Sequence, residues 1–324
     1  MFDPSRPPAI RVTGLRKSFG EHTVLDGIDL HVAAGTVFSL LGPNGAGKTT
    51  AVNIFTTLIR ADAGQVWVAG RSLAEEPDAI RAAIGVTGQF SAVDRLLTGE
   101  ENLIMMGDLH HLPRPETRRR ATELLERFDL TDAAKRLAGT YSGGMTRRLD
   151  LAMSLIGQPS ILFLDEPTTG LDPRSRRTMW QVIGDLADSG VTVFLTTQYL
   201  EEADHLADRI ALLDRGKLVV EGTPGELKCL IPGGHIRMRF NEAASLDAAA
   251  RALGDLPRDH DTLTLQIPSD GSVASLKALL DRVTEQSITV QTLSIHTPDL
   301  DDVFFALTGQ ISAHTADDEK VTTP

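Results

Sequence analysis

The chain has 324 residues, which is enough for two domains of ordinary size. Its formal net charge of -12 argues against a protein that relies on a broad basic surface to bind nucleic acid. The single cysteine, Cys229, excludes an internal disulfide. The sequence has neither a leader-like N-terminus nor an apolar run of about 18 residues, so we expect a chain that does not cross a membrane itself.

After an N-terminal extension of residues 1–9, strand-like apolar runs alternate with helical patterns. This alternation is typical of an α/β domain with a mainly parallel sheet and helices on both faces. The predicted strands are residues 24–32, 36–41, 65–68, 84–86, 161–164, 191–195 and 209–213.

A glycine-rich loop stands between the predicted strand 36–41 and a helical pattern at 51–59. Its glycines would let backbone N–H groups point inward, and the following helix would present the positive end of its dipole to an anion. Lys48 would neutralise the β and γ phosphates of a nucleotide, and the Thr49 hydroxyl would bind Mg²⁺. The alternative is a turn without a ligand, but a lysine and a threonine at the required offset favour a phosphate site. The loop is Gly42-Pro43-Asn44-Gly45-Ala46-Gly47-Lys48-Thr49-Thr50.

A helical insert is predicted for residues 90–140, because apolar residues recur there at helical spacing without a strand pattern. Three adjacent arginines, residues 118–120, could bind phosphate, although a solvated helix face is the commoner role of such a run. His110 and His111 are neighbours rather than four residues apart, which disfavours a metal site on this helix.

The tripeptide Ser142-Gly143-Gly144 precedes a helical pattern at 146–156. A hydroxyl, two glycine N–H groups and a helix N-terminus would form a second anion-binding edge in the same chain. The tripeptide by itself is also compatible with an ordinary helix cap.

Two carboxylates, Asp165 and Glu166, follow the predicted strand 161–164. Open parallel sheets bind ligands at this carboxyl end of their strands. Asp165 is therefore placed to hold Mg²⁺ directly or through water, and Glu166 to polarise the water that attacks the γ-phosphate. Acidic pairs after strands also serve as helix-start carboxylates, but the Lys48 loop favours the catalytic interpretation.

The turn residues 231–234 predict a boundary between a first domain of residues 10–232 and an accessory domain of residues 233–311. Residues 312–324 have few apolar side chains, which predicts disorder. In the accessory domain, the strand-like runs 236–240, 262–267 and 288–296 alternate with the helical patterns 243–253, 273–283 and 300–307.

These motifs, in this order, resemble those of the ATP-binding cassette (ABC) ATPases over about residues 10–230. The Lys48 loop resembles their Walker A motif, Ser142-Gly143-Gly144 their signature motif, and Asp165-Glu166 their Walker B motif with its catalytic glutamate. The resemblance implies a P-loop NTPase fold of the α/β class. This fold has a mainly parallel sheet, a helical subdomain at about residues 90–140 and antiparallel N-terminal strands, and a small C-terminal α/β domain would follow it here.

The resemblance also implies roles for single residues. Phe19 would stack on adenine, and Asp172 would lie in the D-loop. Gln89 would lie in the Q-loop and join Thr49 and Asp165 around Mg²⁺.

Two cassettes of this family face each other head to tail, so the signature motif of one copy would contact the γ-phosphate held by Lys48 of the other. This implication agrees with the two separate phosphate-binding edges in the chain. The residues expected to bind ATP are Phe19, Gly42, Pro43, Asn44, Gly45, Ala46, Gly47, Lys48, Thr49, Thr50, Gln89, Ser142, Gly143, Gly144 and Asp172.

The sequence departs from the family at two places. Tyr141 and Met145 flank the signature glycines where the family usually has leucine and glutamine, and Gln198 stands where it usually has histidine. Glutamine can donate a hydrogen bond to the γ-phosphate but cannot carry charge. We therefore expect Lys48, Glu166 and Gln198 to be the catalytic residues, with hydrolysis slower than is usual or more dependent on Glu166.

These variants and the C-terminal residues 300–309 resemble the daunorubicin-resistance branch of bacterial drug exporters. The resemblance implies an ATPase that uses ATP and Mg²⁺ and drives efflux of drugs or other amphipathic compounds. Its partners would be a second copy of itself and a separate ABC-2-type membrane permease, docked on the helical insert. The protein would then lie at the cytoplasmic face of the cell membrane, with no nucleic acid partner.

Two alternatives remain. One is a soluble ABC ATPase of translation or DNA repair, although such proteins usually have two cassettes in one chain or long coiled coils, and neither is present in this sequence. The other is a non-hydrolysing nucleotide sensor with a regulatory role, which Gln198 motivates.

Overall fold

The computed structural model describes residues 8–88, 91–230, 234–254, 256, 258–269, 273–286, 288–296 and 299–308. The chain divides into two compact units after Pro224. The predicted boundary between residues 232 and 233 falls inside a gap in these ranges, and the predicted tail at 312–324 and most of the N-terminal extension lie outside them.

A mainly parallel sheet runs through the first unit. Among the described residues it has six strands in the order β10-β9-β3-β8-β7-β6, and only β10 is antiparallel to its neighbour. The central strands are buried along their whole length, as expected for strands covered on both faces. The bounds are β3 (Val37–Leu41), β6 (Ile84–Thr87), β7 (Ile161–Asp165), β8 (Thr192–Thr197), β9 (Arg209–Asp214) and β10 (Lys217–Gly222).

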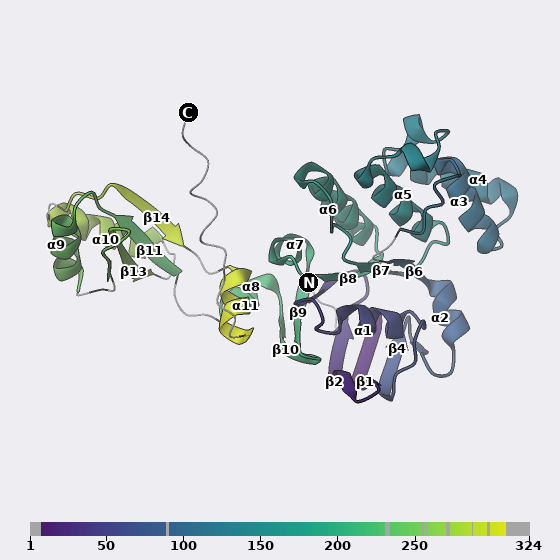
Figure 1. Cartoon of the computed structure of the whole chain (residues 1–324), viewed down its shortest axis with the longest axis horizontal. Coiled ribbons are helices and arrows are strands. Elements are labelled where there is room, and N and C mark those ends of the chain that lie inside the picture. Colours follow the sequence, from purple (N-terminus) through teal and green to yellow (C-terminus); the bar gives the residue numbers. More distant parts are fainter. Residues whose placement is uncertain are drawn as a thin grey trace. The chain divides into compact units, whose positions relative to one another are not determined.

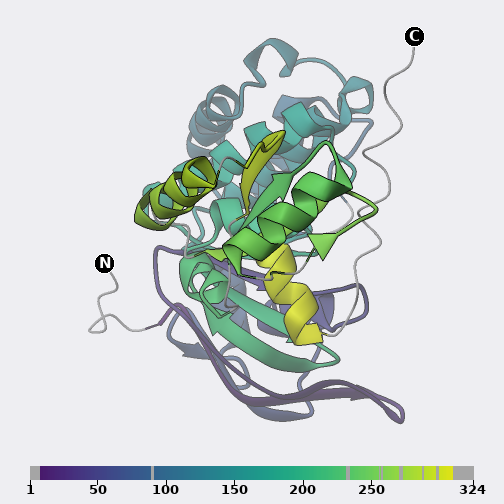
Figure 2. The same ribbon diagram turned by 90° about the vertical axis from the view of Figure 1, so that its left-hand side faces the viewer.

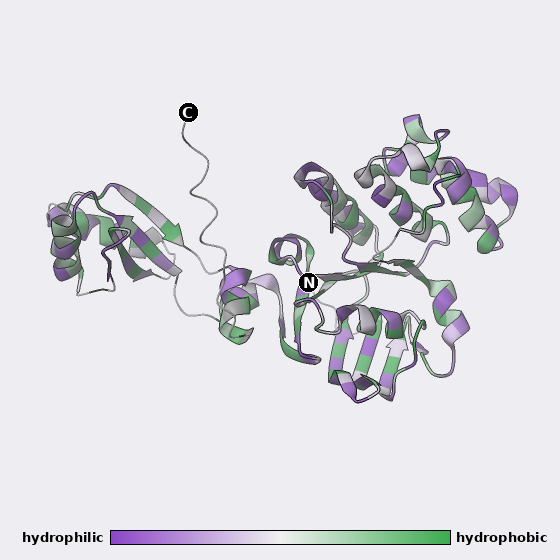
Figure 3. Ribbon diagram, in the orientation of Figure 1, coloured by the Kyte–Doolittle hydropathy of each residue, from purple (hydrophilic) through white to green (hydrophobic). Residues whose placement is uncertain are grey.

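A second sheet in this unit is antiparallel, with the strand order β2-β1-β4-β5 in the part of the chain that the structure describes. Hydrophilic and hydrophobic residues alternate along β1, β2 and β4 (Figure 3) because one face of the sheet is buried and the other is open to water. The predicted strands at 24–32 and 65–68 belong to this sheet, paired with β1. Its strands are β1 (Ile10–Phe19), β2 (His22–Val32), β4 (Ala63–Val68) and β5 (Arg71–Ser72).

Helices cover both faces of the parallel sheet (Figure 1). Helices α3 to α6 lie on one face, while α1 and the antiparallel sheet lie on the other. In the interval of the predicted helical insert the structure has α3 and α4, and α3 begins with a capping box formed by Thr98 and Glu101. The helices of the first unit are α1 (Lys48–Phe55), α2 (Pro77–Ala83), α3 (Gly99–Leu109), α4 (Arg114–Arg127), α5 (Gly143–Leu155), α6 (Pro173–Asp188) and α7 (Leu200–Leu206).

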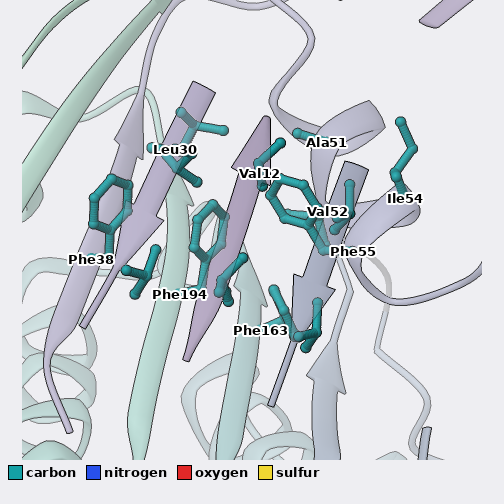
Figure 4. Close-up of a cluster of buried hydrophobic side chains, with 14 of the residues drawn as sticks. Val12, Leu30, Phe38, Ala51, Val52, Ile54, Phe55, Phe163 and Phe194 are labelled. Atoms are coloured by element: carbon teal, nitrogen blue, oxygen red, sulfur yellow. The ribbon is translucent and has the colours of Figure 1, made fainter. Parts of the chain in front are cut away.

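Two hydrophobic cores lie on opposite faces of the parallel sheet. Because successive residues of a strand point to opposite faces, Phe163 of β7 joins one core while its neighbours Leu162 and Leu164 join the other. Phe38 and Phe194 stack in the first core with their ring centroids 5.6 Å apart, beside Phe55 and Phe163 (Figure 4). The sheet is therefore held from both sides, and the ends of its strands have defined positions.

The second unit contains a separate antiparallel sheet with the strand order β12-β13-β11-β14 in its described part. The chain order of strands and helices is β-α-β-β-α-β, a split βαβ arrangement. Ile236, Met238 and Leu265 of the sheet share a core with Leu246 and Leu279 of the helices. In Figure 2 helix α9 crosses in front of these strands. The elements are α8 (Pro224–Lys228), β11 (Gly234–Arg239), α9 (Ala243–Leu253), β12 (Arg258–Asp259), β13 (Thr264–Ser269), α10 (Val273–Glu285), β14 (Thr292–His296) and α11 (Leu300–Thr308).

Candidate nucleotide-binding site

The loop between β3 and α1 needs glycine at three positions. Gly45 and Gly47 have φ angles of 81° and 108°, in the left-handed region that side chains with a Cβ atom disfavour. A Cβ atom on Gly47 would also stand 2.8 Å from the Leu25 side chain, and one on Gly42 would collide with the Leu213 carbonyl oxygen. The loop therefore has a tight backbone conformation that directs N–H groups to its mouth at the start of α1.

Lys48 is the first residue of α1, and its side chain folds back across the loop. It is 5% exposed, and its Nζ donates hydrogen bonds to the carbonyl oxygens of Gly42 at 2.8 Å and Pro43 at 3.1 Å. The same Nζ lies 3.6 Å from Glu166 Oε1. Burial lowers the pKa of Lys48, and the Glu166 carboxylate opposes this shift. The loop thus positions a cation next to the carboxylate that follows β7.

A group of oxygen atoms gathers beside this cation. Thr49 Oγ1 donates to Asp165 Oδ1 at 3.4 Å, and Thr196 Oγ1 donates to the same carboxylate oxygen. Asp165 ends β7 and is 4% exposed, while Thr196 lies on the neighbouring strand β8. Carboxylate and hydroxyl oxygens are the ligands that Mg²⁺ prefers. Thr49 and Asp165 therefore fit a magnesium ion.

Glu166 has a left-handed backbone with φ 47°, which is uncommon for a residue other than glycine. Its N–H donates to the Thr196 carbonyl oxygen at 3.1 Å, and its Oε2 accepts a hydrogen bond from Thr169 at 3.2 Å. Its side chain is 12% exposed. An outlier of this kind persists only where surrounding contacts support it, and it occurs most often at functional sites.

Ser142, Gly143 and Gly144, here termed the signature edge, form the start of α5, where Ser142 and Gly143 are exposed and Gly144 is half-buried. Ser142 caps the helix by accepting a hydrogen bond from the Met145 N–H at 3.3 Å. Its hydroxyl therefore does serve as a cap, and a cap leaves the glycine N–H groups at the helix start available to an anion.

Three further predicted site residues are among the described residues. Asp172 caps α6 by accepting from the N–H groups of Arg174 and Ser175, each at 3.0 Å. Gln198 is half-buried directly after β8, and Phe19 is 53% exposed at the end of β1. Gln89 lies outside the described residues.

The unusual Tyr141 has a structural role before the signature edge. Its hydroxyl donates to the Ala133 carbonyl oxygen at 2.7 Å, and it occupies the space where a Cβ atom on Gly99 would stand. Tyr141 therefore joins the start of α5 to the helical insert.

Some residues at this site were not predicted from the sequence. Thr196 contacts both Asp165 and Glu166, yet it is far from them in the chain and becomes adjacent only because β8 pairs with β7. Glu202 is fully buried and accepts hydrogen bonds from Thr168 at 2.8 Å and Trp180 at 3.1 Å. The only sequence signal for Glu202 is its place in the run after Gln198, because its burial depends on the packing of α6 and α7.

Comparison with known proteins shows similarity over nearly the whole chain. Residues 25–169 match the family described as ABC transporter. The chain is 48% identical to a daunorubicin resistance ATP-binding protein of Streptomyces coeruleorubidus, with 95% of this chain and 97% of that protein covered. It is 33% identical to a linearmycin resistance ATP-binding protein of Bacillus subtilis, with 93% and 98% covered.

Solved structures of ATP-binding cassettes resemble about two thirds of the chain. An ATP-binding cassette of an ABC transporter in its ADP conformation has a TM-score of 0.61 and 25% identity, and the match covers 68% of this chain and 93% of that one. A dimeric ATP-binding cassette in a post-hydrolysis state, bound to ADP and Pi, has a TM-score of 0.60 and 27% identity, with 66% and 98% covered.

Proposed function

The chain belongs to the ABC transporter family of ATP-binding proteins, and from this premise we propose that it is the ATP-hydrolysing subunit of a bacterial exporter of drugs or similar amphipathic compounds. Relatives whose matches cover 93–96% of the chain are named for resistance to daunorubicin, doxorubicin or linearmycin. No helix in the described part of the chain has both the length and the apolar character needed to cross a membrane. A separate membrane permease of the ABC-2 type would provide the path for the drug, with this subunit at its cytoplasmic face.

The observation that carries the proposal is the convergence of three groups at the carboxyl ends of β3 and β7. Lys48 Nζ lies 3.6 Å from Glu166 Oε1, and Thr49 Oγ1 lies 3.4 Å from Asp165 Oδ1. A cation, a nucleophile-activating carboxylate and oxygen ligands for a divalent cation are the parts that phosphoryl transfer to water requires.

Each of these residues has a distinct task in the proposed mechanism. The loop N–H groups and Lys48 hold the β and γ phosphates of ATP, while Glu166 accepts a proton from the attacking water. Gln198 donates a hydrogen bond to the γ-phosphate. Thr49 and Asp165, with Gln89, would hold a magnesium ion, which would supply positive charge to offset the charge of the phosphates.

The site would be completed by a second copy of the chain in a head-to-tail dimer. Ser142 and Gly143 of the signature edge are exposed, and the edge belongs to a different helix from Lys48, so it would be available to the nucleotide held by the other copy. Asp172 lies beside it, and Phe19 would stack on adenine. Two nucleotides would then be held between two copies, and their hydrolysis would separate the copies and move the permease.

Replacing Glu166 with glutamine tests the proposal. Glu166→Gln retains shape and hydrogen bonding but cannot accept the proton, so we expect turnover of Mg-ATP to fall by about 100-fold or more while ATP binding persists. Glu123→Gln, on the exposed face of α4, is the matched control and should retain wild-type turnover. Wild-type turnover in Glu166→Gln would contradict the role of this residue.

A further inference from the structure

We propose that Arg147 is a positioning residue that couples the signature edge to the backbone of Glu166 and, together with Asp150, to Gly88 and Ala92. The inference rests on the proposed function, because it assigns Arg147 a role in ATP hydrolysis. Arg147 lies on α5, about one helical turn after the signature edge.

The guanidinium of Arg147 donates to four backbone carbonyl oxygens. Three of them are consecutive, in residues 165–167, which comprise the last residue of β7 and the two that follow it, at distances of 3.2, 3.4 and 2.9 Å from Arg147 nitrogen atoms. The fourth is that of Gly88, which follows β6, at 2.8 Å. The side chain is only 11% exposed. One residue of α5 therefore joins two strand ends of the parallel sheet.

Asp150, one turn further along α5, completes this connection. Its Oδ2 lies 3.3 Å from Arg147 Nη1, and its Oδ1 accepts the Ala92 N–H at 3.0 Å. Burial raises the pKa of the Asp150 carboxyl, while the Ala92 N–H and Arg147 oppose the shift. Arg147 and Asp150 together hold the chain on both sides of residues 89–90, where the family places its Q-loop.

The contact with Glu166 has a direct consequence for its geometry. Glu166 has φ 47°, with its N–H bound to Thr196 and its carbonyl oxygen bound to Arg147. Removing Arg147 would leave the Glu166 carbonyl oxygen with the Thr169 N–H, at 3.3 Å, as its described donor and so weaken the support of this unfavourable conformation. A movement of α5 with its signature edge would also move the Arg147 donors, and the carboxylate of Glu166 would respond. A lysine could not replace these contacts, because only the arginine fork has five N–H donors in fixed directions.

Arg148 provides a matched control on the same helix. It also donates to a backbone carbonyl oxygen, that of Phe128 at 2.8 Å, and its side chain is 18% exposed. It points to the helical insert rather than to the strand ends. If turnover falls only because α5 is weakened, substitutions of Arg147 and of Arg148 should therefore lower it to the same extent.

The test compares Arg147→Met, Arg147→Lys and Arg148→Met in the full chain by thermal unfolding, ATP affinity and Mg-ATP turnover. We expect Arg147→Met to lower kcat by about tenfold or more with little change in KM, because misplacing a catalytic group affects the chemical step. Arg147→Lys should recover only part of kcat, and Arg148→Met should retain it. Unchanged kcat in Arg147→Met, or equal losses in Arg147→Met and Arg148→Met, would overturn the inference.

Hydrogen exchange separates this inference from the proposed function. Arg147→Met and Asp150→Asn should speed exchange of the Glu166 and Ala92 amides, respectively, whereas Arg148→Met should not. This measurement needs no turnover. If the wild-type chain shows no hydrolysis, the ATPase function is contradicted, but the exchange rates still test the coupling through Arg147. Unchanged amide exchange in both Arg147→Met and Asp150→Asn would refute that coupling.

Discussion

Gly144 packs directly against Ser175, so that a Cβ atom on Gly144 would stand 2.6 Å from Ser175 Oγ. Ser175 Oγ in turn donates to Asp172 Oδ2 at 2.5 Å. The signature edge and the cap of α6 are therefore in contact within one chain. If a second copy binds as proposed, it meets both as a single surface.

The first prediction concerns this contact. Gly144→Ala should lower the free energy of unfolding by about 1–3 kcal/mol, because the added methyl group must displace Ser175 from its bond with Asp172. Gly143→Ala is the control for stability, since a Cβ atom there would have no described heavy atom within 4 Å. Denaturant unfolding of the two variants measures the difference.

A double-mutant cycle identifies the cause. In a Ser175→Ala background the hydroxyl is gone, so Gly144→Ala should cost less than it does in the wild type. Equal costs in the two backgrounds would show that Ser175 is not the group in conflict.

The second prediction concerns Thr196, whose hydroxyl donates to Asp165. Thr196→Val removes the group that orients this carboxylate, so we expect the Mg²⁺ concentration for half-maximal turnover to rise by about tenfold or more. Thr192→Val, a buried threonine at the other end of β8 that accepts a hydrogen bond from the Gly35 N–H, is the control. Turnover is measured as a function of Mg²⁺ concentration. The same half-maximal Mg²⁺ concentration in Thr196→Val and Thr192→Val would contradict an orienting role of Thr196.

The third prediction concerns Gln198. Gln198→His introduces a side chain that can be charged near the phosphate, and we expect turnover to rise, with a new pH dependence near the ordinary histidine pKa of about 6.5. Steady-state kinetics at a series of pH values on both sides of that pKa provide the measurement. Absence of hydrolysis in both forms, even with the permease present, would favour a nucleotide sensor.

The fourth prediction concerns the buried Glu202. Burial raises the pKa of its carboxyl above the ordinary 4.5, while hydrogen bonds from Thr197, Thr168 and Trp180 oppose the shift. A raised pKa in the folded state means that folding favours the protonated form, so this group lowers the free energy of unfolding as pH rises through that pKa. Glu202→Gln has no proton to lose, and its stability relative to the wild type should therefore increase with pH.

Melting temperatures across a pH series check this sign. Glu201→Gln, a change at the adjacent residue whose side chain is 72% exposed, should show a smaller trend. A difference between Glu202→Gln and the wild type that stays constant, or that falls as pH rises, would contradict a raised pKa.

The sequence predicted those features whose information lies in consecutive residues. The glycine loop with Lys48 and the buried strand ending at Asp165 and Glu166 can be recognised locally, because turn conformation, strand burial and ligand chemistry all depend on neighbours in the chain. The helical insert and the α/β class followed from hydrophobic periodicity in the same way.

Only the tertiary structure decided which distant groups meet. The pairing of β7 with β8 brings Thr196 to Asp165, and the packing of α5 against the strand ends brings Arg147 to Glu166. These contacts join residues separated by 31 and 19 positions along the chain. The physical reason is that such pairings result from the burial of whole strands and helices against one another, and no short run of residues carries that information.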